Sequence, residues 1–315
     1  MADMGSVLVA GKGGLIGSAC FRALEQEGIK NVYAPSRSEL DYQDLNAFIS
    51  FLKKNKISKL IFAVGKVGGI VDNMKLPADY ITENIVLHFN AIRAAQAANV
   101  EKAIFFGSSC VYPADAAQPL DPSQLFAGKP EVTSLSYAVS KLATILACQS
   151  HNRQYPHRCL FIPIIPNTAY GPNDHFDETG GHVLSALMQK IHKAKMENAK
   201  SVVIWGSGKP LREFIHSSDI AKACIFLLKA ELNPDTFPLN LSSSVETSIS
   251  ELAQKIAKVV GFSGELVFDT TRPDGAYKKS LNCETMATMG WECSMDLDRG
   301  LQQTYQWFLE NEKTK

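Results

Sequence analysis

Ser108, Tyr137 and Lys141 are residues whose types and spacing could together transfer a proton to a carbonyl group. Tyr137 and Lys141 are four positions apart in a helical pattern, so their side chains share one face of the helix. A tyrosine hydroxyl has an ordinary pKa of about 10, which a neighbouring ammonium group lowers. Ser108 follows an apolar run at 103–106, and its hydroxyl could bond a substrate carbonyl oxygen. The alternative is an exposed helical pair and a serine that caps a strand.

A glycine loop near the N-terminus could hold a phosphate group. The loop pattern is G-x-x-G-x-x-G, and its candidate binding residues are Gly11, Gly14, Leu15, Ile16 and Gly17. It lies between an apolar run at 7–10 and a helical pattern at 15–26. Glycines there allow a tight turn and let backbone N–H groups approach a pyrophosphate at the helix N-terminus. The sequence predicts a dinucleotide-binding loop, and a plain glycine-rich turn is the alternative.

The residues after the second apolar run indicate which dinucleotide binds. NAD-binding folds place an acidic residue there to hold the ribose 2′-hydroxyl. This chain has Ser36 and Arg37 after a run at 32–34. A hydroxyl and a guanidinium suit a 2′-phosphate, because arginine matches phosphate geometry with two parallel hydrogen bonds. We therefore predict NADP(H) as the cofactor; a solvated arginine in a turn is the alternative.

Short apolar runs alternate with helical patterns over the first 172 residues. The expected strands are 7–10, 32–34, 60–64, 103–106 and 160–165. The expected helices are 15–26, 45–54, 80–98 and 137–154. This alternation predicts an α/β fold with a Rossmann-type, doubly wound parallel sheet that is covered by helices on both faces.

The pattern changes after about residue 172. The elements expected there are a loop at 173–181, a helix at 183–195, a strand at 202–205, a helix at 219–229, a strand at 238–241, a helix after 243, a strand at 266–268, a loop around 273–275 and a helix from about 297. We predict an NADP-binding Rossmann domain at 1–172 plus about 216–242. A smaller α/β substrate-binding domain is expected at about 173–215 plus 243–315. A ligand cleft should lie between them, at the carboxyl edge of the parallel strands.

Composition excludes several classes of protein. The 32 basic and 32 acidic residues cancel, which argues against a nucleic-acid or membrane-surface binder. The longest apolar runs stop far short of a membrane span, and the first residues lack a secretory signal. None of the seven cysteines is spaced as C-x-x-C, so no metal site is predicted. Mostly buried free thiols in a reducing cytoplasm are the simplest interpretation.

Several segments together resemble one branch of the extended short-chain dehydrogenase/reductases, the GDP-L-fucose synthases. The segments are Lys66-Val67-Gly68-Gly69-Ile70, Gly107-Ser108-Ser109-Cys110-Val111-Tyr112-Pro113, Tyr137-Ala138-Val139-Ser140-Lys141, Tyr170-Gly171-Pro172, Gly181-His182-Val183, Trp205-Gly206-Ser207-Gly208 and Arg212-Glu213-Phe214. The resemblance covers essentially the whole chain. It implies a homodimer that converts GDP-4-keto-6-deoxy-D-mannose by 3,5-epimerisation and NADPH-dependent reduction at C4.

The resemblance also assigns roles to Cys110 and His182, as the acid and base of epimerisation. C3 and C5 both flank the C4 ketone, which acidifies their protons. Inversion removes a proton on one face and returns one on the other, so it needs two groups of intermediate pKa. A thiol and an imidazole, with ordinary pKa values of about 8.5 and 6.5, suit that task. The alternatives are a structural cysteine beside a strand and a histidine on a surface loop.

The remaining contacts are likewise implied by the resemblance. Substrate is expected at Lys190, Trp205, Arg212 and Lys279, and the cofactor also at Gly107, Ser108, Lys141, Pro166, Asn167, Thr168, Ala169 and His182. The positively charged side chains among them would bind the negatively charged pyrophosphate of the nucleotide. A solvated helix cation is the alternative for Lys190, and core packing for Trp205.

Two departures from the family pattern bear on function. The family has Pro-Thr-Asn where this chain has Pro166-Asn167-Thr168, and Lys12 stands where members can have arginine. The first exchange alters a contact to the nicotinamide or the sugar. The alternative activity is therefore a C4-reductase, with or without epimerisation, of a related GDP-4-keto-6-deoxy hexose or heptose. A cofactor-sensing module is a non-enzymatic alternative, which the intact Ser108, Tyr137 and Lys141 oppose.

Overall fold

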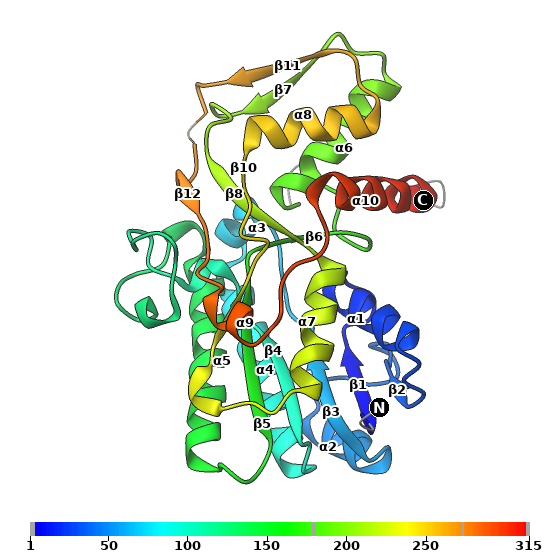
Figure 1. Ribbon diagram of the computed structural model, residues 1–315, viewed down its shortest axis with the longest axis vertical. Helices are drawn as coiled ribbons and strands as arrows, with labels where there is room; N and C mark the ends of the chain where they lie inside the picture. The colour runs from blue at the N-terminus through cyan, green and yellow to red at the C-terminus, as the bar shows by residue number, and fades with distance from the viewer. Residues whose placement is uncertain (1–3, 178–180, 273, 313–315) are drawn as a thin grey trace.

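The computed structural model describes residues 4–177, 181–272 and 274–312, so residues 178–180 and 273 of the two expected loops lie outside the described residues. Its largest sheet has six parallel strands in the order β2-β1-β3-β4-β5-β9. The strands are β1 (Ser6–Ala10), β2 (Val32–Tyr33), β3 (Ile57–Phe62), β4 (Lys102–Phe106), β5 (Leu160–Pro166) and β9 (Leu239–Leu241). Figure 1 shows this sheet in the lower half of the molecule.

Helices cover both faces of the large sheet because successive strand residues point to opposite sides. Val7 and Val9 of β1 pack with α1 (Leu15–Gln26) and α7 (Ser217–Lys229). Leu8 and Ala10 pack on the other face. The helices on that face are α2 (Leu45–Lys54), α4 (Pro77–Ala97) and α5 (Leu135–Gln154). The predicted α/β class with a doubly wound parallel sheet is confirmed.

A smaller α/β layer lies above the large sheet in Figure 1. Its strands are β6 (Thr168–Tyr170), β7 (Ser201–Trp205), β8 (Leu211–His216), β10 (Glu246–Ser248), β11 (Glu265–Asp269) and β12 (Lys278–Lys279). Strand β8 pairs with β6, β10 and β12, while β7 pairs with β11. Helices α6 (Val183–Met196), α8 (Ile249–Val260) and α10 (Leu297–Glu312) share one apolar core with these strands. The division into two domains at the expected boundaries stays a prediction.

The sequence patterns missed several short elements. Strands β6, β10 and β12 have two or three residues each, too few for an alternating pattern to be recognised. The structure also has the short helices α3 (Ile70–Lys75) and α9 (Glu284–Thr288). Single 3₁₀ turns occupy Ser109–Val111, Pro122–Gln124, Val132–Ser134 and Pro234–Thr236. Among the described residues, no helix is both long and apolar enough to cross a membrane.

A buried carboxylate ties the smaller layer to the large sheet. Glu213 of β8 is 3% exposed. Its Oε2 atom accepts hydrogen bonds from Asn167 Nδ2 at 3.0 Å, Ser242 Oγ at 2.6 Å and the Leu281 N–H at 3.1 Å. These donors lie in the segments that follow β5, β9 and β12, so the Glu213 side chain holds three separate segments of the chain together. Several hydrogen bonds of this kind compensate a buried carboxylate for the loss of its contacts with water.

We expect Glu213→Leu to destabilise the fold by about 3 kcal/mol, because three buried donors lose their acceptor. The control is Glu246→Gln on the neighbouring strand β10, whose carboxylate pairs with Lys278 and is 33% exposed. An exposed pair of that kind contributes roughly 0–1 kcal/mol. The measurement is urea unfolding of both variants. A loss for Glu213→Leu no larger than that of the control would contradict the role of this carboxylate.

Candidate active site

The glycine loop has the geometry that a pyrophosphate requires. Gly11 has a φ of +89°, and a Cβ there would lie 2.5 Å from the Ala63 carbonyl oxygen. A Cβ at Gly17 would lie 2.1 Å from the Gly11 carbonyl oxygen. Gly14 caps α1 without a side-chain hydrogen bond, and Leu15 and Ile16 begin the helix. The first N–H groups of α1 therefore remain available to an anion, which the helix dipole also favours.

The expected 2′-phosphate site has an unexpected acidic neighbour. Arg37 is exposed after β2, with no ion pair among the described residues. The Ser36 N–H and hydroxyl donate to Glu39 Oε2 at 2.7 and 2.8 Å. These hydrogen bonds lower the pKa of Glu39. The carboxylate thus occupies the Ser36 donors that a 2′-phosphate would use.

Arg37→Ala should raise the KM for NADPH by the factor that corresponds to a loss of roughly 1.5–3 kcal/mol of binding free energy. The KM for NADH should stay nearly unchanged, because only NADPH carries the 2′-phosphate. Glu39→Gln should lower the KM for NADPH alone, since it removes a like charge. Steady-state kinetics with both cofactors measures these effects, with Lys53→Ala on α2 as the control for a lost surface cation. Equal changes for NADPH and NADH would show that Arg37 does not contact the 2′-phosphate.

Ser108, Cys110 and Tyr137 form one hydrogen-bonded group at the end of β4. Gly107 follows that strand, and a Cβ there would lie 3.1–3.4 Å from Ile145, Ile164 and Ile165. The Ser108 hydroxyl is hydrogen bonded to both the Tyr137 hydroxyl and the Cys110 thiol. Burial, and to a smaller extent Cys110 and Tyr80, raise the pKa of Tyr137. Without ligands the tyrosine is therefore protonated and can donate its proton.

Lys141 lies beside Tyr137 in a buried pocket of polar side chains. It is 4% exposed, and its Nζ atom is 5.5 Å from the centre of the Tyr137 ring. Its Nζ atom is also 3.4 Å from His88 Nε2, and His88 Nδ1 is 2.9 Å from Thr144 Oγ1. Burial lowers the pKa of Lys141 to about 8, an effect that Cys110 partly opposes. The sequence motifs did not indicate His88, which α4 brings to this site.

The pH dependence of stability should report on Lys141. Its pKa in the folded chain is about 8, below the unfolded value of about 10.4. Between these two pKa values the unfolded chain binds more protons at this group than the folded chain does. The contribution of Lys141 to the free energy of unfolding therefore increases as the pH rises from 8 to 10, by up to roughly 3 kcal/mol. The difference in unfolding free energy between wild type and Lys141→Met measures the effect and cancels the other titrations. A difference that does not change with pH would contradict the lowered pKa.

Cys110 lies between the catalytic candidates and the expected substrate cations. Burial raises the pKa of the Cys110 thiol, while Ser108, Lys279 and Lys141 oppose that shift. Glu131 adds to the increase. The Lys279 Nζ atom is 3.4 Å from Glu131 Oε1. Sequence patterns had not indicated Glu131, which lies just before a 3₁₀ turn and has no motif of its own.

Two pairs of expected substrate residues are brought together. Lys279 of β12 lies beside Arg212 of β8 in the strand register. Arg212 donates to the Ala276 carbonyl at 2.8 Å, and burial lowers its pKa. On the neighbouring sheet, Trp205 is 61% exposed, with Lys190 Nζ 5.9 Å from its ring centre. The exposed Trp205 is thus available for stacking, and core packing is wrong for this residue.

His182 lies apart from the tyrosine group, at the N-terminus of α6. Among the described residues, its charge acts on Asp174, where it opposes the increase in pKa that burial produces. Asp174 accepts hydrogen bonds from the Ser185 hydroxyl and the His175 N–H. No contact given by the structure joins His182 to Cys110, so their joint role stays a prediction.

The segment that departs from the family pattern connects the two sheets. Pro166 ends β5, while Thr168 and Ala169 belong to β6 and pair with Phe214 and Ile215. The Asn167 amide donates to Glu213 and to the Lys279 carbonyl, and its oxygen accepts from the Thr168 N–H. This side chain is therefore fully engaged by the protein. We infer that Asn167 fixes the connection and that any cofactor contact here uses its neighbours.

A glycine turn that accepts pyrophosphate and a buried tyrosine–lysine pair at the carboxyl ends of parallel strands define a dinucleotide-dependent oxidoreductase or epimerase. Within the described residues, no cluster of His, Cys, Asp and Glu could hold a metal ion. Residues 7–239 match the NAD dependent epimerase/dehydratase family, and the chain belongs to this family.

Full-length similarity extends to named relatives. The chain is 41% identical over 313 residues to a GDP-L-fucose synthase of Escherichia coli, covering 97% of each chain. A GDP-L-fucose synthetase from Naegleria fowleri bound to NADP superposes with a TM-score of 0.88 at 28% identity, covering 100% of this chain and 97% of that one. A GDP-6-OMe-4-keto-L-xylo-heptose reductase from C. jejuni has a TM-score of 0.88 at 30% identity and covers 99% of both chains.

Proposed function

We propose that this protein is an NADPH-dependent GDP-L-fucose synthase, which epimerises GDP-4-keto-6-deoxy-D-mannose at C3 and C5 and then reduces C4. The observation that carries the proposal is the group formed by Ser108, Cys110, Tyr137 and Lys141 below the cations Arg212 and Lys279. It combines a proton donor for a carbonyl oxygen with an acid–base thiol beside a pyrophosphate-binding surface. The similarity to the Escherichia coli enzyme supports the same assignment.

In epimerisation, Cys110 and His182 exchange protons at C3 and C5 on opposite faces of the sugar. Lys279 and Lys141 favour the thiolate form of Cys110, which is the form that removes a proton. The Ser108 hydroxyl donates to the C4 oxygen and stabilises the negative charge that develops there. Arg212, Lys279 and Lys190 hold the diphosphate, and Trp205 stacks on the sugar or base.

In reduction, bound NADPH supplies a hydride to C4. Tyr137 donates its proton to the C4 oxygen, and Lys141 stabilises the tyrosinate that remains. Lys141 also bonds the nicotinamide ribose, and His88 positions its ammonium group. The glycine loop and Arg37 would hold the phosphates of the cofactor, and Ser36 would join them once its donors leave Glu39. Gly107 and residues 166–169 would border the nicotinamide.

The decisive test is the stereochemistry of the product by NMR, starting from GDP-4-keto-6-deoxy-D-mannose in deuterated water. GDP-L-fucose with deuterium at C3 and C5 is the expected product. Reduction without deuterium at either carbon would replace the proposal with the alternative, a C4-reductase. That alternative has support in the similarity to the heptose reductase and in the altered segment at 166–169. Failure to consume NADPH with any GDP-4-keto sugar would exclude both activities.

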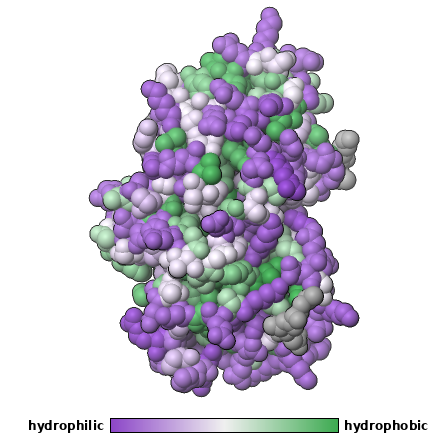
Figure 2. Space-filling view, viewed as in Figure 1, coloured by the Kyte–Doolittle hydropathy of each residue, from purple (hydrophilic) through white to green (hydrophobic). Residues whose placement is uncertain are grey.

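We further propose a homodimer through the outer faces of α4 and α5. Four apolar side chains on these adjacent helices are exposed, namely Val86, Phe89, Val139 and Leu146. Figure 2 shows one face of the molecule, where apolar side chains reach the surface across the middle. Burying such groups in a symmetric contact would stabilise the pair. Light scattering coupled to size exclusion tests this state.

A cytoplasmic location is proposed from the thiols. All seven cysteines are free in the structure, and four of them are buried. Free thiols in this number persist in a reducing compartment. Localisation of a tagged full-length chain in its own cell is the test.

A further inference from the structure

A pocket separate from the candidate active site lies where α1 packs against α7 (Figure 1). Its volume is about 700 Å³. One face of α1 lines it with Ala19, Arg22, Ala23 and Gln26, spaced as one helical stripe. One side of α7 along its whole length and the start of α10 close the other sides. None of the proposed catalytic or substrate residues lines this pocket.

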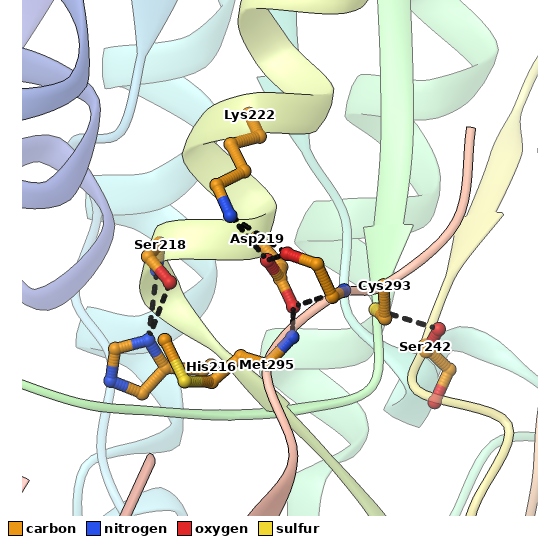
Figure 3. A network of polar contacts seen from close by, with 8 residues as sticks. His216, Ser218, Asp219, Lys222, Ser242, Cys293 and Met295 are labelled. Carbon is orange, nitrogen blue, oxygen red and sulfur yellow. Dashed lines mark hydrogen bonds and ion pairs between the residues drawn. The ribbon is translucent and has the colours of Figure 1, made fainter. Parts of the chain in front are cut away.

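Two buried hydrogen-bond donors in this lining have no partner among the residues that the structure describes. Ser217 is 0% exposed and His216 is 3% exposed. Neither Ser217 Oγ nor His216 Nε2 is hydrogen bonded. The Ser218 N–H donates to His216 Nδ1, so in the neutral ring the proton is on Nε2. Figure 3 shows Nε2 on the side of the ring away from Ser218 and Asp219. Both groups therefore offer a hydrogen and need an acceptor.

Both donors lie against Gly171, which has no side chain. A Cβ on Gly171 would lie 2.4 Å from Ser217 Oγ and 3.2 Å from His216 Nε2. The two donors therefore lie close to each other, on the same side of Gly171. Burial lowers the pKa of His216 to about 4, so the ring is neutral at physiological pH and donates without carrying a charge.

Among the described charged side chains around the pocket, those without an ion-pair partner are positively charged. Arg22 is half-buried, and it donates a hydrogen bond to the neutral Asn173 Oδ1 at 3.1 Å. Burial lowers its pKa, as expected for a cation without a carboxylate. Arg299 is exposed with no ion pair among the described residues. The other cations are paired, Lys222 with Asp219 and Lys229 with Glu27.

We propose that this pocket, with Arg22, His216 and Ser217 as its donors, binds an oxyanion of the phosphate class. Within the described lining, both buried groups without a partner can donate a hydrogen and the unpaired charges are positive, which are two properties of a phosphate site. The Arg22–Asn173 hydrogen bond connects the pocket to Asp174 and thus to the loop that carries His182.

The test is calorimetric titration of the full-length protein with inorganic phosphate. Saturating NADP⁺ and GDP are present, so that the two nucleotide sites cannot contribute. We expect one site with a dissociation constant of about 1–10 mM, an ordinary affinity for a lone oxyanion. Arg22→Gln and Ser217→Ala should each weaken binding about tenfold, because each removes one direct donor. Neither change removes a hydrogen bond that the core needs.

The control is Lys255→Gln, which removes a cation that pairs with Asp298 on α10, outside the pocket. This variant should bind phosphate like wild type. The proposal is overturned by heat that does not saturate up to about 50 mM phosphate, or by either pocket variant binding as wild type does. A crystal structure grown in phosphate that shows only water at His216 and Ser217 would also overturn it. The titration does not measure catalysis, so its result is independent of the proposed activity.

Discussion

Tyr137→Phe should lower the rate of C4 reduction by at least about 10²-fold, because the variant keeps the ring but loses the proton donor. The hydroxyl is hydrogen bonded to Ser108, and burial raises its pKa, so the wild-type residue enters the reaction protonated. Epimerisation uses other residues, so exchange of deuterium at C3 and C5 should continue. NADPH oxidation and NMR of the substrate measure the two steps separately.

The matched control is Tyr80→Phe. Tyr80 lies edge-on to Tyr137 with ring centres 6.0 Å apart, and it is also buried. Removing its hydroxyl keeps the packing of both rings and should change the rate only slightly. If exchange at C3 and C5 stopped together with reduction in Tyr137→Phe, the assignment of the two steps to separate residues would be wrong.

Cys110→Ser should nearly abolish epimerisation, because a serine hydroxyl is a far weaker base than a thiolate. His182→Asn should suppress it as well, by removing the second proton-transfer group. Both variants should still bind NADPH, since the glycine loop and Arg37 are unchanged. NMR of deuterium at C3 and C5 in each variant is the measurement.

Cys283→Ser is the control for the loss of a half-buried thiol elsewhere in the chain. Burial raises the pKa of Cys283 to about 12 and Glu213 adds to the increase, whereas Lys279 and Lys141 oppose the increase at Cys110. The Cys283→Ser variant should epimerise like wild type. Exchange in wild type that survives Cys110→Ser would preserve the activity but assign the base to another group.

The features that sequence predicts best here are local. The glycine loop is recognisable because its spacing follows from the turn between one strand and the next helix, and Gly11 and Gly17 have the close backbone contacts expected of it. Tyr137 and Lys141 share a helix, so their separation of four residues is enough to place them together. The parallel sheet and the family resemblance, both predicted from such patterns, are confirmed.

The surroundings of those residues depend on tertiary structure. His88 is 53 residues from Lys141 and contacts it only because α4 packs beside α5. Glu39 is close to Ser36 in sequence, yet a serine three residues before a glutamate does not reveal that the carboxylate occupies the donors of a cofactor site.

What the sequence by itself determined is which groups could do chemistry and the class of fold that carries them, because both follow from local spacing and periodicity. Tertiary structure alone decided how those groups are tuned and held. Glu213 illustrates the reason, since it bonds Asn167, Ser242 and Leu281 from three separate chain segments. Burial of such contacts sets the pKa values of Lys141 and Tyr137, and burial is a property of the packed chain that no motif contains.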